Sequence, residues 1–122
     1  MIKYNKELNS NDLEELLTGS SKIALSHEAE ERIQASYDFL KNFSQEKVIY
    51  GINTGFGPMS QYRIDDADMV QLQLNLIRSH AAGAGNHLAD MQVRAAMIAR
   101  LATFAQGWSG VHPSLPALLV QF

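Results

Sequence analysis

Two stretches of this chain carry residue types that could do chemistry, and the first is a glycine-rich segment. Residues 50–57 read YGINTGFG. Glycine allows a positive φ and a close approach of the backbone to a ligand, so the segment predicts either a sharp turn or a binding loop. Tyr50 stands at its start, where a tyrosine can act as an acid or a base if a nearby cation or dipole favours the phenolate. The alternative is a tyrosine packed on the core with its hydroxyl satisfied.

The second stretch is Ser79-His80, which stands just before another pair of glycines. A histidine on an apolar helix stripe is more often a core residue than a ligand, yet a helix end beside flexible glycines is a reasonable pocket wall. His87 follows at no standard metal-ligand spacing, and neither His27 nor His112 has an evident partner. We therefore expect no metal site.

Phosphate-binding motifs do not explain the glycine segment. No Lys-Ser or Lys-Thr follows it, as in a P-loop, and the dinucleotide pattern GxGxxG is absent. The whole chain has ten lysines and arginines against thirteen acidic residues, a net charge of −3. Without a basic excess to meet a phosphate backbone, a nucleic-acid partner is not expected.

The elements that must position these residues are expected to be helices. A third helix, over residues 66–82, carries two adjacent apolar stripes, which predict burial on most sides. Three-residue to four-residue strands are expected at 22–25 and 48–50. The sequence thus predicts a mainly α fold with a small β element and a glycine-rich loop. Apolar spacing and caps predict the helices at 9–17, 26–42, 66–82 and 90–107, with a last apolar segment, 115–122, capped by Ser114.

Length and composition describe one domain or less. The chain has 122 residues, 46% of them hydrophobic, and no cysteine, which excludes disulfides and thiol nucleophiles. No apolar run approaches the roughly 20 residues of a membrane span, and the start has no secretory signal. We expect a cytoplasmic protein without a membrane partner. The last segment is apolar and has no helix stop signal, which suggests a piece of something larger.

Residues 50–57 resemble the aromatic amino acid ammonia-lyases, the family of histidine, phenylalanine and tyrosine lyases. Three further stretches agree in order. The resemblance extends over most of the chain and implies the N-terminal helical region of the lyase fold, residues 1–122, truncated before the family's Ala-Ser-Gly segment. These stretches are 72–80 (LQLNLIRSH, followed by GAG), 94–101 (RAAMIARL) and 107–113 (GWSGVHP).

The resemblance implies an elimination of ammonia that gives coumarate from tyrosine or urocanate from histidine. By position, Tyr50 matches the catalytic tyrosine proposed as the base for the β-proton, and His80 matches the residue that faces the substrate ring. Ser79 would line the same wall, and Gly57 would let the loop backbone pass near the substrate. A histidine can hydrogen-bond a phenol or an imidazole, whereas phenylalanine offers neither. Residues 57–64 (GPMSQYRI) look closest to bacterial tyrosine lyases, which favours tyrosine slightly over histidine.

The family's electrophile is 4-methylidene-imidazol-5-one (MIO), formed from an internal Ala-Ser-Gly. No Ala-Ser-Gly occurs in the 122 residues. The resemblance therefore implies that the cofactor forms outside this chain and that the chain alone is inactive. Ala102 stands where the family usually has asparagine, which could cost about 1–3 kcal/mol if a buried partner is left unpaired.

The full enzymes of the family are homotetramers that act on a small amino acid. A chain truncated before the central helices is expected to expose the apolar faces of its third and fourth helices and of residues 115–122. Two alternatives stay open: a related aminomutase, which shares these motifs, and a non-catalytic helical binding or scaffold module.

Overall fold

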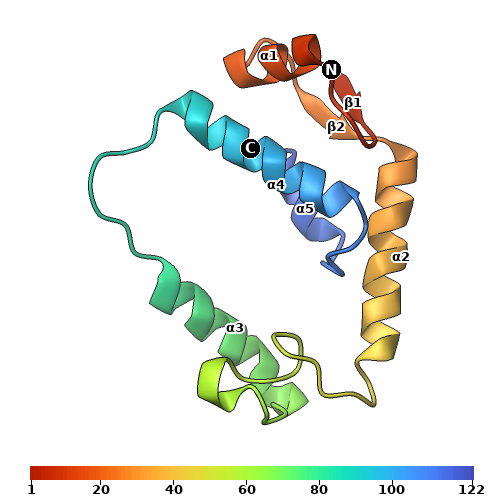
Figure 1. The fold of residues 1–122 in the computed structure, drawn as a ribbon, viewed down its shortest axis with the longest axis vertical. Helices are drawn as coiled ribbons and strands as arrows, with labels where there is room; N and C mark the ends of the chain where they lie inside the picture. Colours follow the sequence, from red (N-terminus) through yellow and green to blue (C-terminus); the bar gives the residue numbers. More distant parts are fainter. The chain divides into compact units, whose positions relative to one another are not determined.

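The computed structural model describes residues 1–122, the side chain of Asp66 apart, and the chain is mainly helical (Figure 1). The residues group into two units, 1–41 with 87–122, and 42–86. The expected mainly α fold with a small β element is confirmed. The elements are β1 (Ile2–Tyr4), α1 (Ser10–Thr18), β2 (Ile23–Leu25), α2 (His27–Phe43), the 3-10 helix η1 (Gly57–Met59), α3 (Asp66–His80), α4 (Asp90–Ala105) and α5 (Ser114–Leu119).

The unit formed by residues 1–41 and 87–122 has an apolar core between its strands and helices. β1 and β2 pair in parallel, with Ile2 opposite Ile23. A parallel pair needs a crossover connection, and α1 supplies it. Tyr4 of β1, Ala29 of α2 and Ala105 of α4 form the buried cluster, so one small apolar centre joins elements from both ends of the chain.

Arg32 of α2 ties this core to its surroundings. Its Nε donates to the Ala105 carbonyl at 3.1 Å, and its Nη2 donates to the Asn5 carbonyl at 2.6 Å. Ala102 packs against the same buried cluster. Within the described residues, no buried side-chain nitrogen or oxygen lacks a hydrogen bond. The described part of the chain therefore contains no buried side-chain group left unpaired by the alanine at 102.

Local caps set the starts of the first two helices. The Asn9 side chain accepts a hydrogen bond from the Asp12 backbone N–H at 2.8 Å, and Ser26 Oγ accepts from the Ala29 N–H at 3.2 Å. Each cap satisfies a backbone donor that has no partner inside the helix. The predicted helices over 9–17, 26–42, 66–82 and 90–107 are confirmed, with ends that move by one or two residues.

The strand predicted at residues 48–50 is wrong. The Ile49 N–H donates to the Asn53 side chain at 2.8 Å, and the Ile49 carbonyl accepts from the Ile52 and Asn53 N–H groups. These backbone groups close a turn and cannot pair with a strand. The partner of β2 is β1, at the start of the chain. β1 has only three residues, which is too short for an alternating pattern to predict a strand.

Ser114 does not cap the last helix. It is the first residue of α5, and Pro113 occupies the cap position without a side-chain hydrogen bond. The Ser114 N–H instead donates to Nδ1 of His112 at 3.2 Å. The His112 side chain thus accepts a backbone hydrogen bond at the start of α5, whereas the sequence predicted a cap by the Ser114 hydroxyl.

α3 is exposed, although its two apolar stripes predicted burial on most sides. Val70 is 70% exposed and Ile77 is 64% exposed. An apolar stripe is buried only where a partner covers it. Among the described side chains of α3, Met69, Leu72 and Leu76 are half-buried, and none is fully buried. Exposure of this kind is what the resemblance implied for α3, α4 and the last segment, where the exposed apolar residues are Val70, Leu74, Ile77, Met91, Val93, Leu115, Leu118 and Phe122.

Within the described residues, no helix combines the length and the apolar character that a bilayer crossing requires.

Candidate functional site

The glycine-rich loop is organised around the side chain of Asn53, which is 7% exposed. Its Nδ2 donates to the carbonyl of Ser44 at 3.0 Å and to that of Lys47 at 2.7 Å, while its Oδ1 accepts from the Ile49 N–H at 2.8 Å. Its backbone carbonyl accepts from the Ile64 N–H at 3.0 Å. One amide side chain therefore holds the incoming segment of the loop in a fixed path.

Thr54 closes the loop from the other side. Its Oγ1 accepts from the Gly51 N–H at 3.2 Å and donates to the Gly55 carbonyl at 2.9 Å. Its backbone forms an antiparallel bridge with Arg63, and the Gly55 N–H donates to the Tyr62 carbonyl at 3.3 Å. The loop is thus closed by hydrogen bonds at both ends, which limits the positions open to the residues that it carries.

Tyr50 projects from this loop. Its side chain is 63% exposed, and its ring meets the Phe56 ring edge-on, with centroids 6.2 Å apart. Within the described residues no hydrogen bond is found for its hydroxyl. Within the described chain the ring of Tyr50 is therefore mostly open to solvent and is not packed on a core.

Two glycines are required for different reasons. Gly57 has φ 56°, in the left-handed region, and a Cβ there would meet no atom within 4 Å. A Cβ on Gly55 would lie 2.6 Å from the Cβ of Met59, so that position has no room for a side chain. The backbone at Gly57 is therefore open on its Cβ side, as a loop that passes near a ligand requires.

Ser79 and His80 occupy the last turn of α3, and both are exposed. Nδ1 of His80 lies 2.9 Å from the Leu76 carbonyl oxygen and 3.0 Å from Ser79 Oγ. Ser79 Oγ also donates to the Leu76 carbonyl at 3.0 Å. The two side chains form one hydrogen-bonded group that leaves Nε2 of the imidazole uncovered.

The four predicted site residues form two pairs. Tyr50 and Gly57 belong to one loop, and Ser79 and His80 belong to one helical turn, which lies about 20 Å along α3 from the start of that helix. In the described part of the chain, no hydrogen bond joins the two pairs. Sequence reasoning missed Asn53 as the centre of the loop, although asparagine side chains often bond nearby backbone groups in turns.

Cavities in the described residues lie away from these pairs. One of about 510 Å³ belongs to the unit of residues 1–41 and 87–122 and includes Arg94, Leu101 and Phe122 in its wall. Another, of about 370 Å³, lies beside the first turns of α3 and includes Arg63 and Asp68. None of the four predicted site residues lines either cavity, so neither is assigned to the expected reaction.

Comparison with known proteins gives a consistent set of relatives. The sequence pattern of the family described as aromatic amino acid lyase matches residues 8–122. The histidine ammonia-lyase of Shouchella clausii is 36% identical over 122 residues, which cover 99% of this chain and 24% of that protein.

Solved structures agree with the sequence matches. The tyrosine aminomutase of Streptomyces globisporus has a TM-score of 0.85 and 33% identity, covering 98% of this chain and 23% of that one. Ergothionase of Treponema denticola, an ergothioneine-degrading enzyme, has a TM-score of 0.90 and 26% identity, covering 99% of this chain and 25% of that one. The chain spans about a quarter of the length of these relatives.

Proposed function

Because the chain belongs to the aromatic amino acid lyase family, we propose that it supplies the base-bearing loop and the ring-recognition turn of an ammonia-lyase. The reaction proposed is removal of ammonia from tyrosine, to give coumarate, or from histidine, to give urocanate. The observation that carries this proposal is Tyr50, whose free and exposed hydroxyl stands on a loop closed by hydrogen bonds.

Tyr50 is proposed as the base. Its phenolate oxygen would take the β-proton, the electrons of that C–H bond would form the double bond, and ammonia would leave the α-carbon with the electrons of the C–N bond. A positioned general base contributes about 10²–10⁴-fold in rate. The bonds made by Asn53 and Thr54 support this role, since a base must be held within reach of the proton that it removes.

His80 is proposed as the contact for the substrate ring, with Ser79 on the same wall. Gly57 is proposed to let the loop backbone pass near the substrate. A phenol or an imidazole can hydrogen-bond the imidazole of His80, and a phenyl ring cannot. Residues 57–64 favour tyrosine, and the histidine ammonia-lyase relative keeps histidine as a candidate.

The group that supplies the electrophile in this family, MIO, cannot form from the residues of this chain. Its precursor is an Ala-Ser-Gly, and the 122 residues contain none. We propose that the 122-residue chain is inactive alone and that it works within a longer, cytoplasmic and homotetrameric enzyme. Ammonia release from the purified 122-residue chain would refute the first part of this proposal.

Absorbance spectroscopy of the complete gene product tests the function. Tyrosine, histidine and phenylalanine are offered separately, and growth of a coumarate or urocanate band is expected with tyrosine or histidine. A folded enzyme that forms no product from any of the three contradicts the lyase proposal.

An aminomutase is the second candidate, because a tyrosine aminomutase shares this fold at a TM-score of 0.85 and 33% identity. The same reaction mixtures, separated by chromatography, distinguish it. A β-amino acid as the main product would replace the lyase by the aminomutase.

A further inference from the structure

The ring of His80 is held at one nitrogen by a group that can only accept. Nδ1 lies 2.9 Å from the Leu76 carbonyl oxygen, which has no hydrogen to give. The hydrogen between these two atoms must therefore be on the ring. Ser79 Oγ lies 3.0 Å from Nδ1 and donates its own hydrogen to the Leu76 carbonyl at 3.0 Å, so it also accepts from Nδ1. All three contacts are satisfied when neutral His80 carries its hydrogen on Nδ1.

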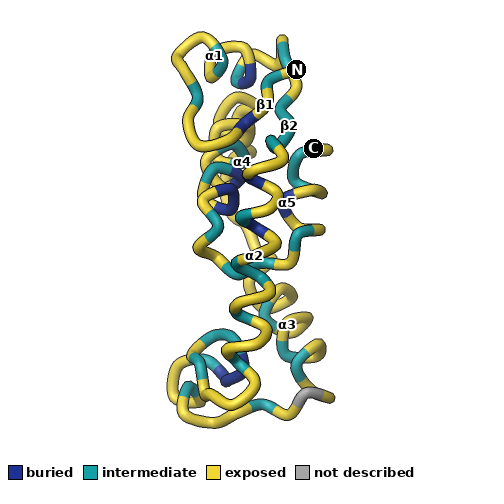
Figure 2. Tube along the Cα trace, turned by 90° about the vertical axis from the view of Figure 1, so that its right-hand side faces the viewer, coloured by how far each residue is buried: buried dark blue, intermediate teal, exposed yellow. Residues whose placement is uncertain are grey.

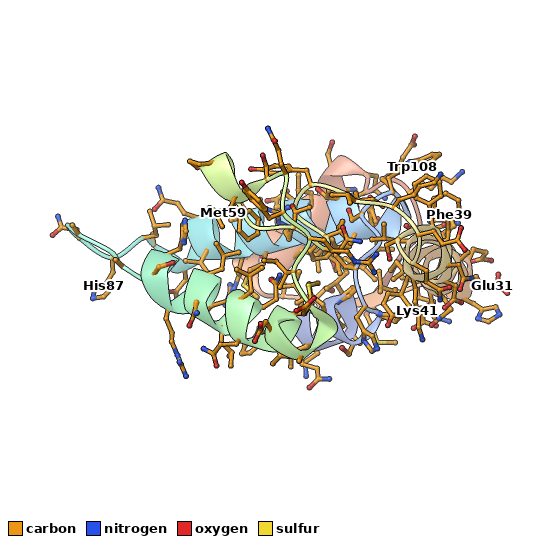
Figure 3. All side chains as sticks on the ribbon, turned by 90° about the horizontal axis from the view of Figure 1, so that it is seen from below. Glu31, Phe39, Lys41, Met59, His87 and Trp108 are labelled. Atoms are coloured by element: carbon orange, nitrogen blue, oxygen red, sulfur yellow. The ribbon has the colours of Figure 1, made fainter. Side chains whose placement is uncertain are left out.

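His112 has the opposite arrangement in the same chain. Its Nδ1 accepts from the Ser114 backbone N–H at 3.2 Å, and a backbone N–H can only donate. Neutral His112 must therefore carry its hydrogen on Nε2. His87 provides a reference, because its side chain extends from the loop between α3 and α4 and makes no hydrogen bond within the described residues (Figure 3).

We propose that the Leu76 carbonyl and the Ser79 hydroxyl hold neutral His80 in the Nδ1–H tautomer, so that its exposed Nε2 is a hydrogen-bond acceptor only. Ser79 is then a positioning residue. It acts on the ligand through the proton position of the neighbouring imidazole.

An acceptor at Nε2 selects ligands whose ring brings a donor. A phenol O–H or an imidazole N–H pairs with it, whereas a phenyl ring leaves Nε2 without water and without a partner. This last step rests on the proposed function, because it takes the ligand to be an aromatic amino acid. The tautomer itself rests on the hydrogen bonds alone.

Nitrogen NMR of the 122-residue chain, labelled with ¹⁵N-histidine, tests the tautomer. At about pH 8.5, where an ordinary histidine is neutral, a two-bond ¹H–¹⁵N correlation separates protonated from unprotonated ring nitrogens. His80 is expected to show a protonated Nδ1 and His112 a protonated Nε2, with the His80→Gln variant assigning the peaks. A protonated Nε2 at His80 overturns the proposal.

Substitution of Ser79 tests whether its hydroxyl helps to fix the tautomer of His80. Ser79→Ala is expected to lower the ratio of Nδ1–H to Nε2–H at His80 by about two- to tenfold, because one of two acceptors is lost. Ser79→Thr keeps a hydroxyl and is expected to restore the ratio. The His112 signals serve as the control and should not move. An unchanged His80 ratio in Ser79→Ala would remove Ser79 from the proposal.

Kinetics of the complete enzyme test the consequence for the ligand. Ser79→Ala is expected to lower kcat/KM for tyrosine or histidine by about two- to tenfold, and Ser79→Thr, which keeps the hydroxyl, is expected to restore it. If His80 has a protonated Nδ1 but the complete enzyme has no lyase activity, the proposed function is contradicted and the proposed tautomer is supported. If the complete enzyme is an active lyase but His80 has a protonated Nε2, the proposed tautomer is contradicted and the proposed function is supported.

Discussion

The two units of this chain are stabilised by different kinds of buried group. In the unit of residues 1–41 and 87–122, the buried positions are mostly apolar and lie where strands and helices meet (Figure 2). In residues 42–86, the buried positions among the described residues are Asn53, Thr54 and Gly55, all in the loop. The first unit is built by packing and the second by hydrogen bonds.

This difference follows from what each kind of interaction can specify. Burial of apolar surface is worth about 25 cal/mol per Å² and has little directional preference, so it assembles elements without fixing a particular backbone path. The hydrogen bonds between the Asn53 amide and three backbone groups are directional and define that path. The residues proposed for chemistry, Tyr50 and His80, accordingly lie in the unit that has no apolar core of its own.

The largest expected effect is the loss of a core side chain in the first unit. Leu101 is 2% exposed, so Leu101→Ala leaves a cavity and should lower the free energy of unfolding by about 2–5 kcal/mol. Leu74, on α3, is 40% exposed, and Leu74→Ala is the matched control, with an expected loss below about 1 kcal/mol. Urea unfolding of both variants measures the difference. Equal losses would mean that the apolar face of α3 is packed in solution.

The next effect is expected in the loop. Asn53→Ala leaves the Ser44 and Lys47 carbonyls and the Ile49 N–H without their partner, at a cost of about 1–3 kcal/mol. Hydrogen exchange should show the Ile49 amide losing protection while the amides of α4 keep theirs.

Asn75→Ala is the control for the loop variant. Asn75 is exposed and accepts one side-chain hydrogen bond, from Gln71 at 2.7 Å, so little change in exchange is expected. If Asn53→Ala and Asn75→Ala have the same exchange pattern, the loop does not depend on its buried amide.

A smaller effect is expected at the start of α2. Ser26→Ala removes the cap on the Ala29 N–H and should lower the free energy of unfolding by about 1 kcal/mol. Ser10→Ala is the control, because Asn9 and not Ser10 caps α1. Thermal unfolding of the two variants provides the comparison, and an equal decrease in both contradicts the assignment of Ser26 as a cap.

Ser26→Ala is also expected to change the pKa of the Glu28 carboxyl. The Ser26 hydroxyl, followed by the backbone N–H of Glu28, holds the pKa of the Glu28 carboxyl below its ordinary value. A lowered pKa adds stability above the unfolded value, and that stability is lost as the pH falls through the folded value. NMR titration of the Glu28 carboxyl should show its pKa rising toward the ordinary value in Ser26→Ala. No rise would mean that the hydroxyl does not bond this carboxylate.

The parts of the fold that depend on neighbours in sequence could be predicted. Caps such as Asn9 and Ser26 act within three residues, and apolar spacing places the long helices to within two residues. The path at residues 48–50 could not be predicted, because the Asn53 side chain takes the hydrogen bonds that a strand would use. The exposure of α3 could not be predicted either, because the spacing of apolar residues does not show whether another element covers them.

The candidate site divides in the same way. Motif resemblance found Tyr50, Gly57, Ser79 and His80, and the aromatic amino acid lyase family confirms that resemblance. Their roles stay predictions. The proton position on His80 depends on a carbonyl one helical turn earlier, which residue types alone do not indicate.

The most direct test of the account compares two tyrosines of the same region in the complete enzyme. Tyr50 is 63% exposed and Tyr62 is 61% exposed, so loss of either hydroxyl should affect folding equally little. Steady-state kinetics with tyrosine and with histidine should show kcat lowered by about 10²–10⁴-fold in Tyr50→Phe and changed less than about twofold in Tyr62→Phe. A Tyr50→Phe enzyme as active as Tyr62→Phe would contradict the assignment of Tyr50 as the base.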